Sequence, residues 1–233
     1  MRNLEFFRRY AYYYLYAIAA VLILTMGIDR AATAVWAEST DLPVIVIDPG
    51  HGGSDGGTVS ATGQKESEIN LQISLRLHDL LTFLGLNSEM LRIDDISLGT
   101  DTNSIRAEKV SDLKNRVARI NEMENALVLS IHQNHFPESR YAGPQVFCTS
   151  ESKDLAEKLQ QMLNTATGGT RNPKKAEGIY LMEHIRFPGV LIECGFLSNP
   201  GEDNLLKTPD YQKKLACVIG ACVGEYLISQ AAA

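Results

Sequence analysis

The spacing of apolar and polar residues divides the chain, from about residue 43 onward, into alternating strands and helices. The run Pro43–Ile47 is apolar on both faces and rich in β-branched residues, which predicts a buried central strand. A glycine-dense loop follows, and then a helix over 69–84 with its apolar residues on one face. A strand over 87–92 would complete a β-loop-α-β unit.

The rest of the chain continues this alternation. The polar stretch 94–112 predicts an extended loop, and a second amphipathic helix follows over 113–123. The pattern then predicts strands at 126–131, 145–149 and 189–193, helices at 155–163 and 211–228, and a loop at 167–175. No segment repeats. We therefore expect a single α/β domain with a central, mostly parallel or mixed sheet flanked by helices.

An apolar segment precedes this domain. Residues 11–28 carry no charge and follow the basic pair Arg8 and Arg9. As a helix they would span about 27 Å, close to the thickness of a bilayer core. The segment 1–37 is therefore expected to be a signal peptide or a membrane anchor, because small-residue cleavage sites end at Ala34 and Ala37 but the run is long for a signal. Under the positive-inside rule, residues 38–233 lie outside the cytoplasm.

Composition narrows the class of protein. Hydrophobic residues make up 45% and charged residues 21% of the 233 residues, which excludes intrinsic disorder and a multi-pass membrane protein. Four cysteines exclude a disulfide scaffold, and we expect them to be small apolar fillers. A net charge of −6 argues against a nucleic-acid partner.

Polar residues stand where three predicted buried strands end. These residues are His51 with Asp48, His132, and Glu193, and the carboxyl ends of such strands form the ligand crevice of an open α/β sheet. Glu66, in the first turn of the helix after the glycine loop, would face the same edge. Two histidines and a carboxylate with an open fourth position are the ligand set of a catalytic zinc site.

The ordinary alternative is that each histidine is only a loop residue, and it is the joint placement at strand ends that favours a metal site. A phosphate-binding glycine loop is a second alternative, but the loop lacks the Gly-Lys-Ser/Thr ending that such loops carry. Glycines at 50, 52, 53, 56 and 57 would instead let the backbone turn sharply and let a bulky substrate approach.

Four segments in order, 47–57, 66–71, 130–134 and 190–199, resemble the motifs of the zinc-dependent N-acetylmuramoyl-L-alanine amidases. The resemblance covers residues 43–228 and implies that His51, Glu66 and His132 bind one zinc ion, and that Glu193 is the catalytic residue. It favours Glu66 over Glu68, because Asn-Leu follows Glu66 at the family's spacing. His135 is expected at the rim of the cleft.

The segments 104–116, 132–134 and 177–182 are similar to the germination-specific amidases, which prepare spore-cortex peptidoglycan for muramic-δ-lactam formation. This resemblance implies an extracytoplasmic location, in the forespore intermembrane space or cortex. Between His132 and Glu193 the chain has no long insert of the kind that holds an autoinhibitory helix, so its activity is expected to be set by location or by a partner. The resemblance implies that this partner is a lipoprotein activator.

The expected reaction is hydrolysis of the amide between the lactyl group of N-acetylmuramic acid and L-alanine, with Glu193 as general base. Asn134, Gln133 and Arg116 are candidate substrate contacts, although an arginine on a helix is more often solvated or salt-bridged. Two alternatives remain open: a metallocarboxypeptidase-like wall peptidase, which has the same ligand set, and a catalytically silent peptidoglycan-binding module.

Overall fold

The computed structural model describes residues 42–100 and 104–231, so the predicted N-terminal signal or anchor lies outside the described residues. A six-stranded mixed sheet with strand order β2-β1-β3-β6-β4-β5 forms the centre. The strands are β1 (Val44–Pro49), β2 (Ser88–Met90), β3 (Ala126–Asn134), β4 (Gln145–Cys148), β5 (Lys174–Lys175) and β6 (Gly189–Phe196). β2, β1, β3 and β6 run parallel, and β4 is antiparallel to β6. The predicted α/β domain with a mixed sheet is confirmed.

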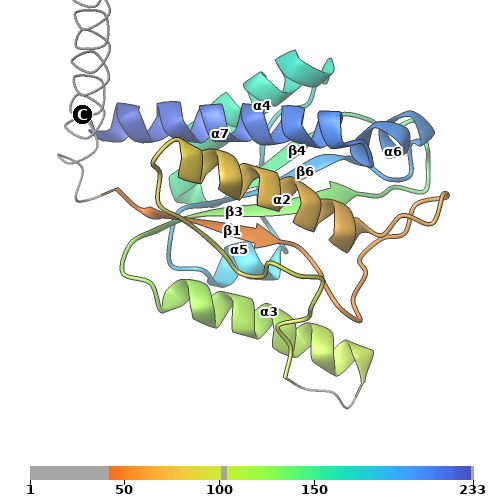
Figure 1. The fold of residues 1–233 in the computed structure, drawn as a ribbon, viewed down its shortest axis with the longest axis horizontal. Helices are drawn as coiled ribbons and strands as arrows, with labels where there is room; N and C mark the ends of the chain where they lie inside the picture. The colour runs from red at the N-terminus through yellow and green to blue at the C-terminus, as the bar shows by residue number, and fades with distance from the viewer. Residues whose placement is uncertain (1–41, 101–103, 232–233) are drawn as a thin grey trace, which may run out of the picture. The chain divides into compact units, whose positions relative to one another are not determined.

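Helices cover both faces of the sheet (Figure 1). They are α2 (Glu66–Phe83), α3 (Ile105–Asn121), the short 3-10 helix η1 (Ser150–Ser152), α4 (Lys153–Thr167), α5 (Tyr180–His184), α6 (Pro200–Leu206) and α7 (Pro209–Ala231). α2, α4 and α7 lie on one face, and α3 and α5 lie on the other. The continuous apolar run of β1 follows from this arrangement, because Ile45, Val46 and Ile47 are fully buried between two helical layers.

α7 is long and apolar enough to cross a membrane, judged by length and composition alone. It packs along α2 and α4, and its residues Leu215, Ile219 and Val223 are buried. These contacts give α7 the role of a covering helix in the core of the domain.

The largest difference from the sequence prediction concerns α3, which begins at Ile105 inside the stretch expected to be a loop. Its first turn is capped by Ser104, whose side chain accepts a hydrogen bond from the Ala107 amide. The hydrophobicity pattern does not show where this helix begins, because two of its buried residues, Asp112 and Arg116, are charged. Helices α5 and α6 have 5 and 7 residues and are too short to show a helical period.

Candidate metal centre

The loop that follows β1 turns sharply at Gly50 and His51. His51 has a positive φ of 60°, the left-handed conformation that residues with a Cβ rarely adopt. A Cβ at Gly50 would lie 2.2 Å from the His132 ring, so only glycine lets the loop pass this close to β3. The loop thereby brings His51 beside the carboxyl end of the neighbouring strand.

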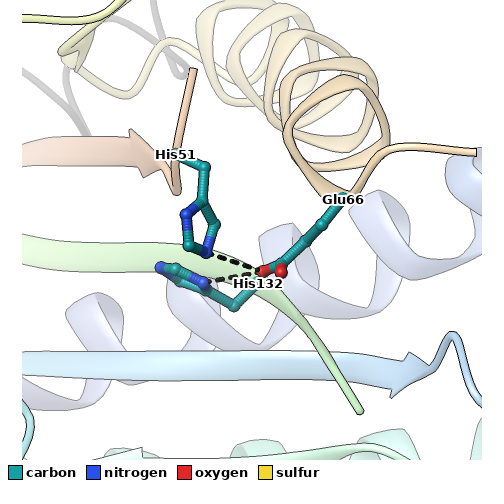
Figure 2. A group of neighbouring side chains, drawn as sticks. All are labelled: His51, Glu66 and His132. Carbon is teal, nitrogen blue, oxygen red and sulfur yellow. Dashed lines mark hydrogen bonds and ion pairs between the residues drawn. The ribbon is translucent and has the colours of Figure 1, made fainter. Parts of the chain in front are cut away.

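Three side chains from distant parts of the sequence meet there (Figure 2). Glu66 Oε1 lies 2.9 Å from His132 Nδ1 and 3.3 Å from His51 Nε2. The ligand atoms of all three residues lie within 4.8 Å of one another, as a single ion with bonds of about 2 Å requires. The three residues predicted as ligands are thus brought together, and within the described residues this is the one such His/Cys/Asp/Glu group.

Backbone and amide groups fix the Glu66 carboxylate. Its Oε2 accepts the Thr58 amide at 3.0 Å, and its Oε1 accepts the Gln133 amide at 3.1 Å and Asn70 Nδ2 at 3.3 Å. Burial alone would raise the pKa of Glu66, but hydrogen bonds and charges from His132 and His51 hold it well below its usual range. Glu66 is therefore an anion at neutral pH, as a metal ligand must be.

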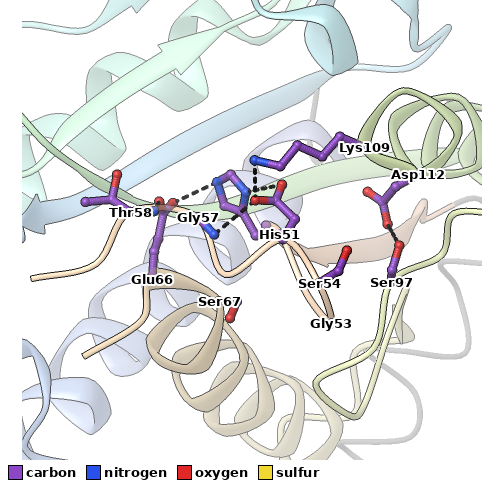
Figure 3. Close-up of polar contacts among 12 residues, drawn as sticks. His51, Gly53, Ser54, Gly57, Thr58, Glu66, Ser67, Ser97, Lys109 and Asp112 are labelled. Atoms are coloured by element: carbon purple, nitrogen blue, oxygen red, sulfur yellow. Dashed lines mark hydrogen bonds and ion pairs between the residues drawn. The ribbon is translucent and has the colours of Figure 1, made fainter. Parts of the chain in front are cut away.

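The other ring nitrogen of His51, Nδ1, is hydrogen-bonded within the protein. Nδ1 lies 2.8 Å from Asp55 Oδ2, and Asp55 Oδ1 accepts the Gly57 amide and pairs with Lys109 at 2.6 Å (Figure 3). A carboxylate on Nδ1 fixes the tautomer that leaves the Nε2 lone pair free for a metal. Burial would lower the pKa of His51, but in the metal-free chain the bonds and charges of Asp55 and Glu66 raise it to about 9. Metal binding would therefore have to displace the proton from Nε2.

Glu193 lies beside this group on β6. It pairs in parallel register with His132 on β3, so the two side chains leave the sheet on the same face. Its Oε2 is buried and has no hydrogen-bond partner within the described structure. Burial raises the pKa of Glu193, His132 and His51 oppose this shift and Glu66 adds to it, and the net result is a pKa of about 7. An orphaned carboxylate oxygen next to a metal-ligand group is typical of a catalytic site rather than of a core.

A cavity of about 380 Å³ opens beside the two histidines. Its other walls come from α3, with Lys109 and Leu113, and from the segment 178–181 around the start of α5. Charged side chains, among them Lys109 and Arg116, line this cavity together with apolar ones, and this mixture suits an organic substrate of mixed polarity.

The three candidate substrate contacts differ in how deeply their side chains are buried. Gln133 is 3% exposed and binds Asn70, and Arg116 is 2% exposed with its guanidinium bound to Asp48, Asp112 and backbone carbonyls. Both side chains are thus bound by protein groups and Arg116 also lines the cavity, so their contact with substrate stays a prediction. Asn134, the last residue of β3, is half-buried, and its contact with substrate stays a prediction.

Glu68, the sequence alternative to Glu66, accepts a hydrogen bond from Gln64. His135, expected at the rim of the cleft, is exposed beyond the end of β3. Residues that sequence reasoning missed are Asp55, Asn70 and Arg92. Asp55 follows His51 by four residues, and Asn70 follows Glu66 by one helical turn, so spacing from the ligands was the available signal. No sequence signal pointed to Arg92, because it lies beyond the end of β2, far from the ligands in sequence.

Cys148, Cys194 and Cys222 are buried, as predicted, but Cys217 is exposed.

A mixed α/β sheet with a His-Glu-His group at the carboxyl ends of its strands, and a free carboxylate beside it, defines the class of metal-dependent hydrolases. The comparison with protein families is more specific. Residues 45–224 match the N-acetylmuramoyl-L-alanine amidase family Amidase_3, and the chain belongs to this family of hydrolases, which is generally zinc-dependent.

The individual proteins to which the chain is similar are amidases as well. The chain is 38% identical to the germination-specific N-acetylmuramoyl-L-alanine amidase of Bacillus subtilis over 189 residues, which are 79% of each protein. It is 27% identical to the amidase AmiA of Escherichia coli over 231 aligned positions, covering 78% of this chain and 75% of AmiA. Among solved structures, it is similar to the CwlD amidase from Clostridioides difficile in complex with the GerS lipoprotein. That match has a TM-score of 0.76 and 36% identity, and it covers 80% of this chain and 98% of the other.

Proposed function

We propose that this chain hydrolyses the amide bond between the lactyl group of N-acetylmuramic acid and L-alanine in peptidoglycan, with one Zn²⁺ held by His51, Glu66 and His132. The observation that carries the proposal is the meeting of these three ligand atoms within 4.8 Å, beside the orphaned oxygen of Glu193. When bound, zinc would polarise the scissile carbonyl and lower the pKa of a bound water to about 7.

The donor set fits zinc. Two neutral imidazole nitrogens and one carboxylate are the ligands of many catalytic zinc sites, and they leave a fourth position open. His51 would bind through Nε2, since Asp55 occupies Nδ1, and His132 would bind through Nδ1, which faces Glu66. The ligand atom of each histidine is thus the ring nitrogen that faces Glu66.

The catalytic role falls to Glu193. As general base it would take a proton from the attacking water, and it would return that proton to the leaving nitrogen of L-alanine. Its Oε2 is free for this work because no protein group in the described structure binds it. The cavity beside His51 and His132 would give the substrate access to these two candidate ligands.

The test is Glu193→Gln, which keeps the shape of the side chain and removes the base. Zinc content should stay at one per chain, while release of stem peptides from purified peptidoglycan should fall by about 100-fold or more. Glu68→Gln is the matched control and should retain activity, since Glu68 contacts Gln64 outside the site. Mass spectrometry of the products decides the bond: a free L-alanine amino terminus supports the proposal, and cleavage between amino acids with an intact lactyl amide contradicts it.

We further propose a setting in spore-cortex maturation, outside the cytoplasm. The supports are the 38% identity to a germination-specific amidase and the 36% identity to an amidase solved with a lipoprotein. Residues 1–37 would direct the chain to the membrane as a signal or anchor, and residues 38–233 would form the catalytic domain. In sporulating cells that lack the gene, the cortex should contain no muramic δ-lactam; a normal content would contradict this setting and leave the enzymatic proposal intact.

A further inference from the structure

Two buried arginines grip the backbone of the loop that carries His51. Arg92 enters from the end of β2 and Arg116 from α3, and each is 2% exposed. We propose that this pair, which we call the arginine clamp, is a positioning device that holds His51 in its metal-binding orientation before any metal arrives. The inference rests on the proposed zinc site.

The contacts of the clamp fall on three successive carbonyl oxygens. Pro49 O accepts Arg92 Nε and Arg116 Nη1, both at 2.9 Å. Gly50 O accepts Arg92 Nη2 at 3.0 Å, and His51 O accepts Arg116 Nη2 at 2.7 Å. Every carbonyl from the end of β1 to the candidate ligand itself is therefore bound to a guanidinium.

Both guanidinium groups are also held by residues outside the loop of His51. Arg116 is bound by Asp48 at the end of β1 and by Asp112 one turn earlier in α3, where Nε meets Oδ2 at 2.6 Å. Arg92 donates to the carbonyl oxygens of Asp94 and Ser67, both at 2.9 Å. A planar guanidinium with several donors at fixed angles can serve an anchor and two loop carbonyls together, which a lysine ammonium on a flexible stem cannot do.

The backbone of His51 explains why such a clamp is useful. Its φ of 60° is unfavourable for a residue with a Cβ, and conformations of this kind persist only where the surroundings over-determine them. The carbonyl of His51 is bound by Arg116 on one side of the residue, and the His51 ring is bound by Asp55 on the other. Without the clamp, the loop would relax and the Nε2 atom would leave the position facing Glu66.

A purely structural role for these arginines makes a different prediction, because loss of buried contacts would lower stability without changing the geometry of the metal. The test therefore measures metal binding itself, on the full 233-residue chain purified in detergent. Arg92→Lys and Arg116→Lys keep the charge and lose the forked donors. The Zn²⁺ dissociation constant, from competition with a chromophoric chelator, should rise by about 10- to 100-fold in each. The visible absorption bands of the Co²⁺-substituted proteins should also move from those of the unaltered chain.

The matched control is Gln160→Met. Gln160 is 1% exposed and also binds backbone groups, Val146 N and Pro144 O, but near the opposite edge of the sheet. It should lower stability and leave the Zn²⁺ dissociation constant and the Co²⁺ spectrum unchanged. Asp112→Asn weakens the anchor of Arg116 without changing a residue of the His51 loop. It should shift the Zn²⁺ dissociation constant and the Co²⁺ spectrum in the same direction as the lysine variants do. If the lysine variants fail to fold, this variant tests the proposal.

The outcomes separate the two proposals. If the unaltered chain binds no zinc, the proposed function fails. If the unaltered chain binds zinc and His51→Ala does not, while the variants of Arg92, Arg116 and Asp112 that fold bind zinc with the original dissociation constant and spectrum, the arginine clamp is refuted and the metal site stands.

Discussion

Two glycines lie so close to the candidate ligands that the absence of their side chains is part of the site: Gly50 lies against His132, and Gly57 against His51 and Glu66. Gly57 has a φ of 67°, and a Cβ placed there would lie 2.6 Å from Glu66 Oε2 and 2.8 Å from the His51 ring. The left-handed backbone and the crowding both require glycine at this position. The glycine-dense loop thus serves the candidate ligands directly, in addition to allowing sharp turns.

Gly57→Ala should weaken zinc binding, since the new methyl group would displace one or both ligands. Gly63→Ala is a matched control, because Gly63 also has a positive φ, 86°, but a Cβ added there would meet nothing within 4 Å. Both variants should lose about 1–3 kcal/mol of unfolding free energy from backbone strain. Only Gly57→Ala should raise the Zn²⁺ dissociation constant, measured by chelator competition; equal constants in the two variants would contradict the crowding argument.

Asp55 holds the far nitrogen of His51, and its charge is shared with Lys109. Asp55→Asn should raise the Zn²⁺ dissociation constant by about 10- to 100-fold, because the tautomer and basicity of His51 would no longer be fixed. Asp95→Asn provides the comparison. Asp95 accepts the Gly53 amide of the same loop at 3.1 Å but touches no histidine, so its replacement should leave zinc binding unchanged.

At the scale of elements, one buried ion pair joins β1 to α3. Arg116 is bound to Asp48 and Asp112, and Asp48 also accepts the Ser130 hydroxyl of β3 at 2.7 Å. The charges of Asp48 and Asp112 outweigh burial and hold the pKa of Arg116 above its ordinary range. Three elements therefore meet at one charge network directly beneath the loop of His51.

Arg116→Met should destabilise the fold by about 3–5 kcal/mol, since it leaves the Asp48 carboxylate buried without a counter-charge. Chemical denaturation monitored by circular dichroism measures this loss. In the double variant Asp48→Asn with Arg116→Met, part of the stability should return, because the uncompensated charge is gone. A double variant less stable than Arg116→Met alone would show that the ion pair is not the source of the loss.

This network also shows what a sequence can reveal about such a fold. The buried strands were predictable, because burial on both faces leaves a continuous run of β-branched residues, and the apolar helices were predictable from their periodicity. The two histidines followed from polar residues at strand ends, and Glu66 from its place in the first turn of the next helix. The start of α3 was not predictable, because its inward-facing residues Asp112 and Arg116 are charged. The burial of Arg116 was also not predictable, because it depends on Asp48, 68 positions away in the chain.

At the scale of the whole molecule, Asp48 links stability to pH. Burial would raise its pKa, but the charge of Arg116 and the Ser130 hydrogen bond outweigh burial and lower it from the ordinary value of 3.8. A carboxyl with a lowered folded pKa contributes stability above its unfolded pKa and loses that contribution as the pH falls through the folded pKa.

The difference in unfolding free energy between the original chain and Asp48→Asn should therefore be largest above about pH 4 and should shrink in more acidic solution. Urea denaturation at a series of pH values measures it. A difference that stayed constant between neutral and acidic pH would show that Asp48 is not the group responsible.

Metal binding should stabilise the whole domain, because the three candidate ligands come from β3, α2 and the loop after β1, and meet only in the folded chain. A ligand at 100 times its dissociation constant adds about 2.7 kcal/mol, which for a domain of this size corresponds to a rise in melting temperature of about 5–10 °C. Adding a chelator should reverse this rise, and calorimetry would record it. His51→Ala should melt at the same temperature with zinc or with chelator, since a single lost ligand removes the site. If zinc raised the melting temperature of His51→Ala as much as that of the original chain, the stabilising ion would have to bind elsewhere.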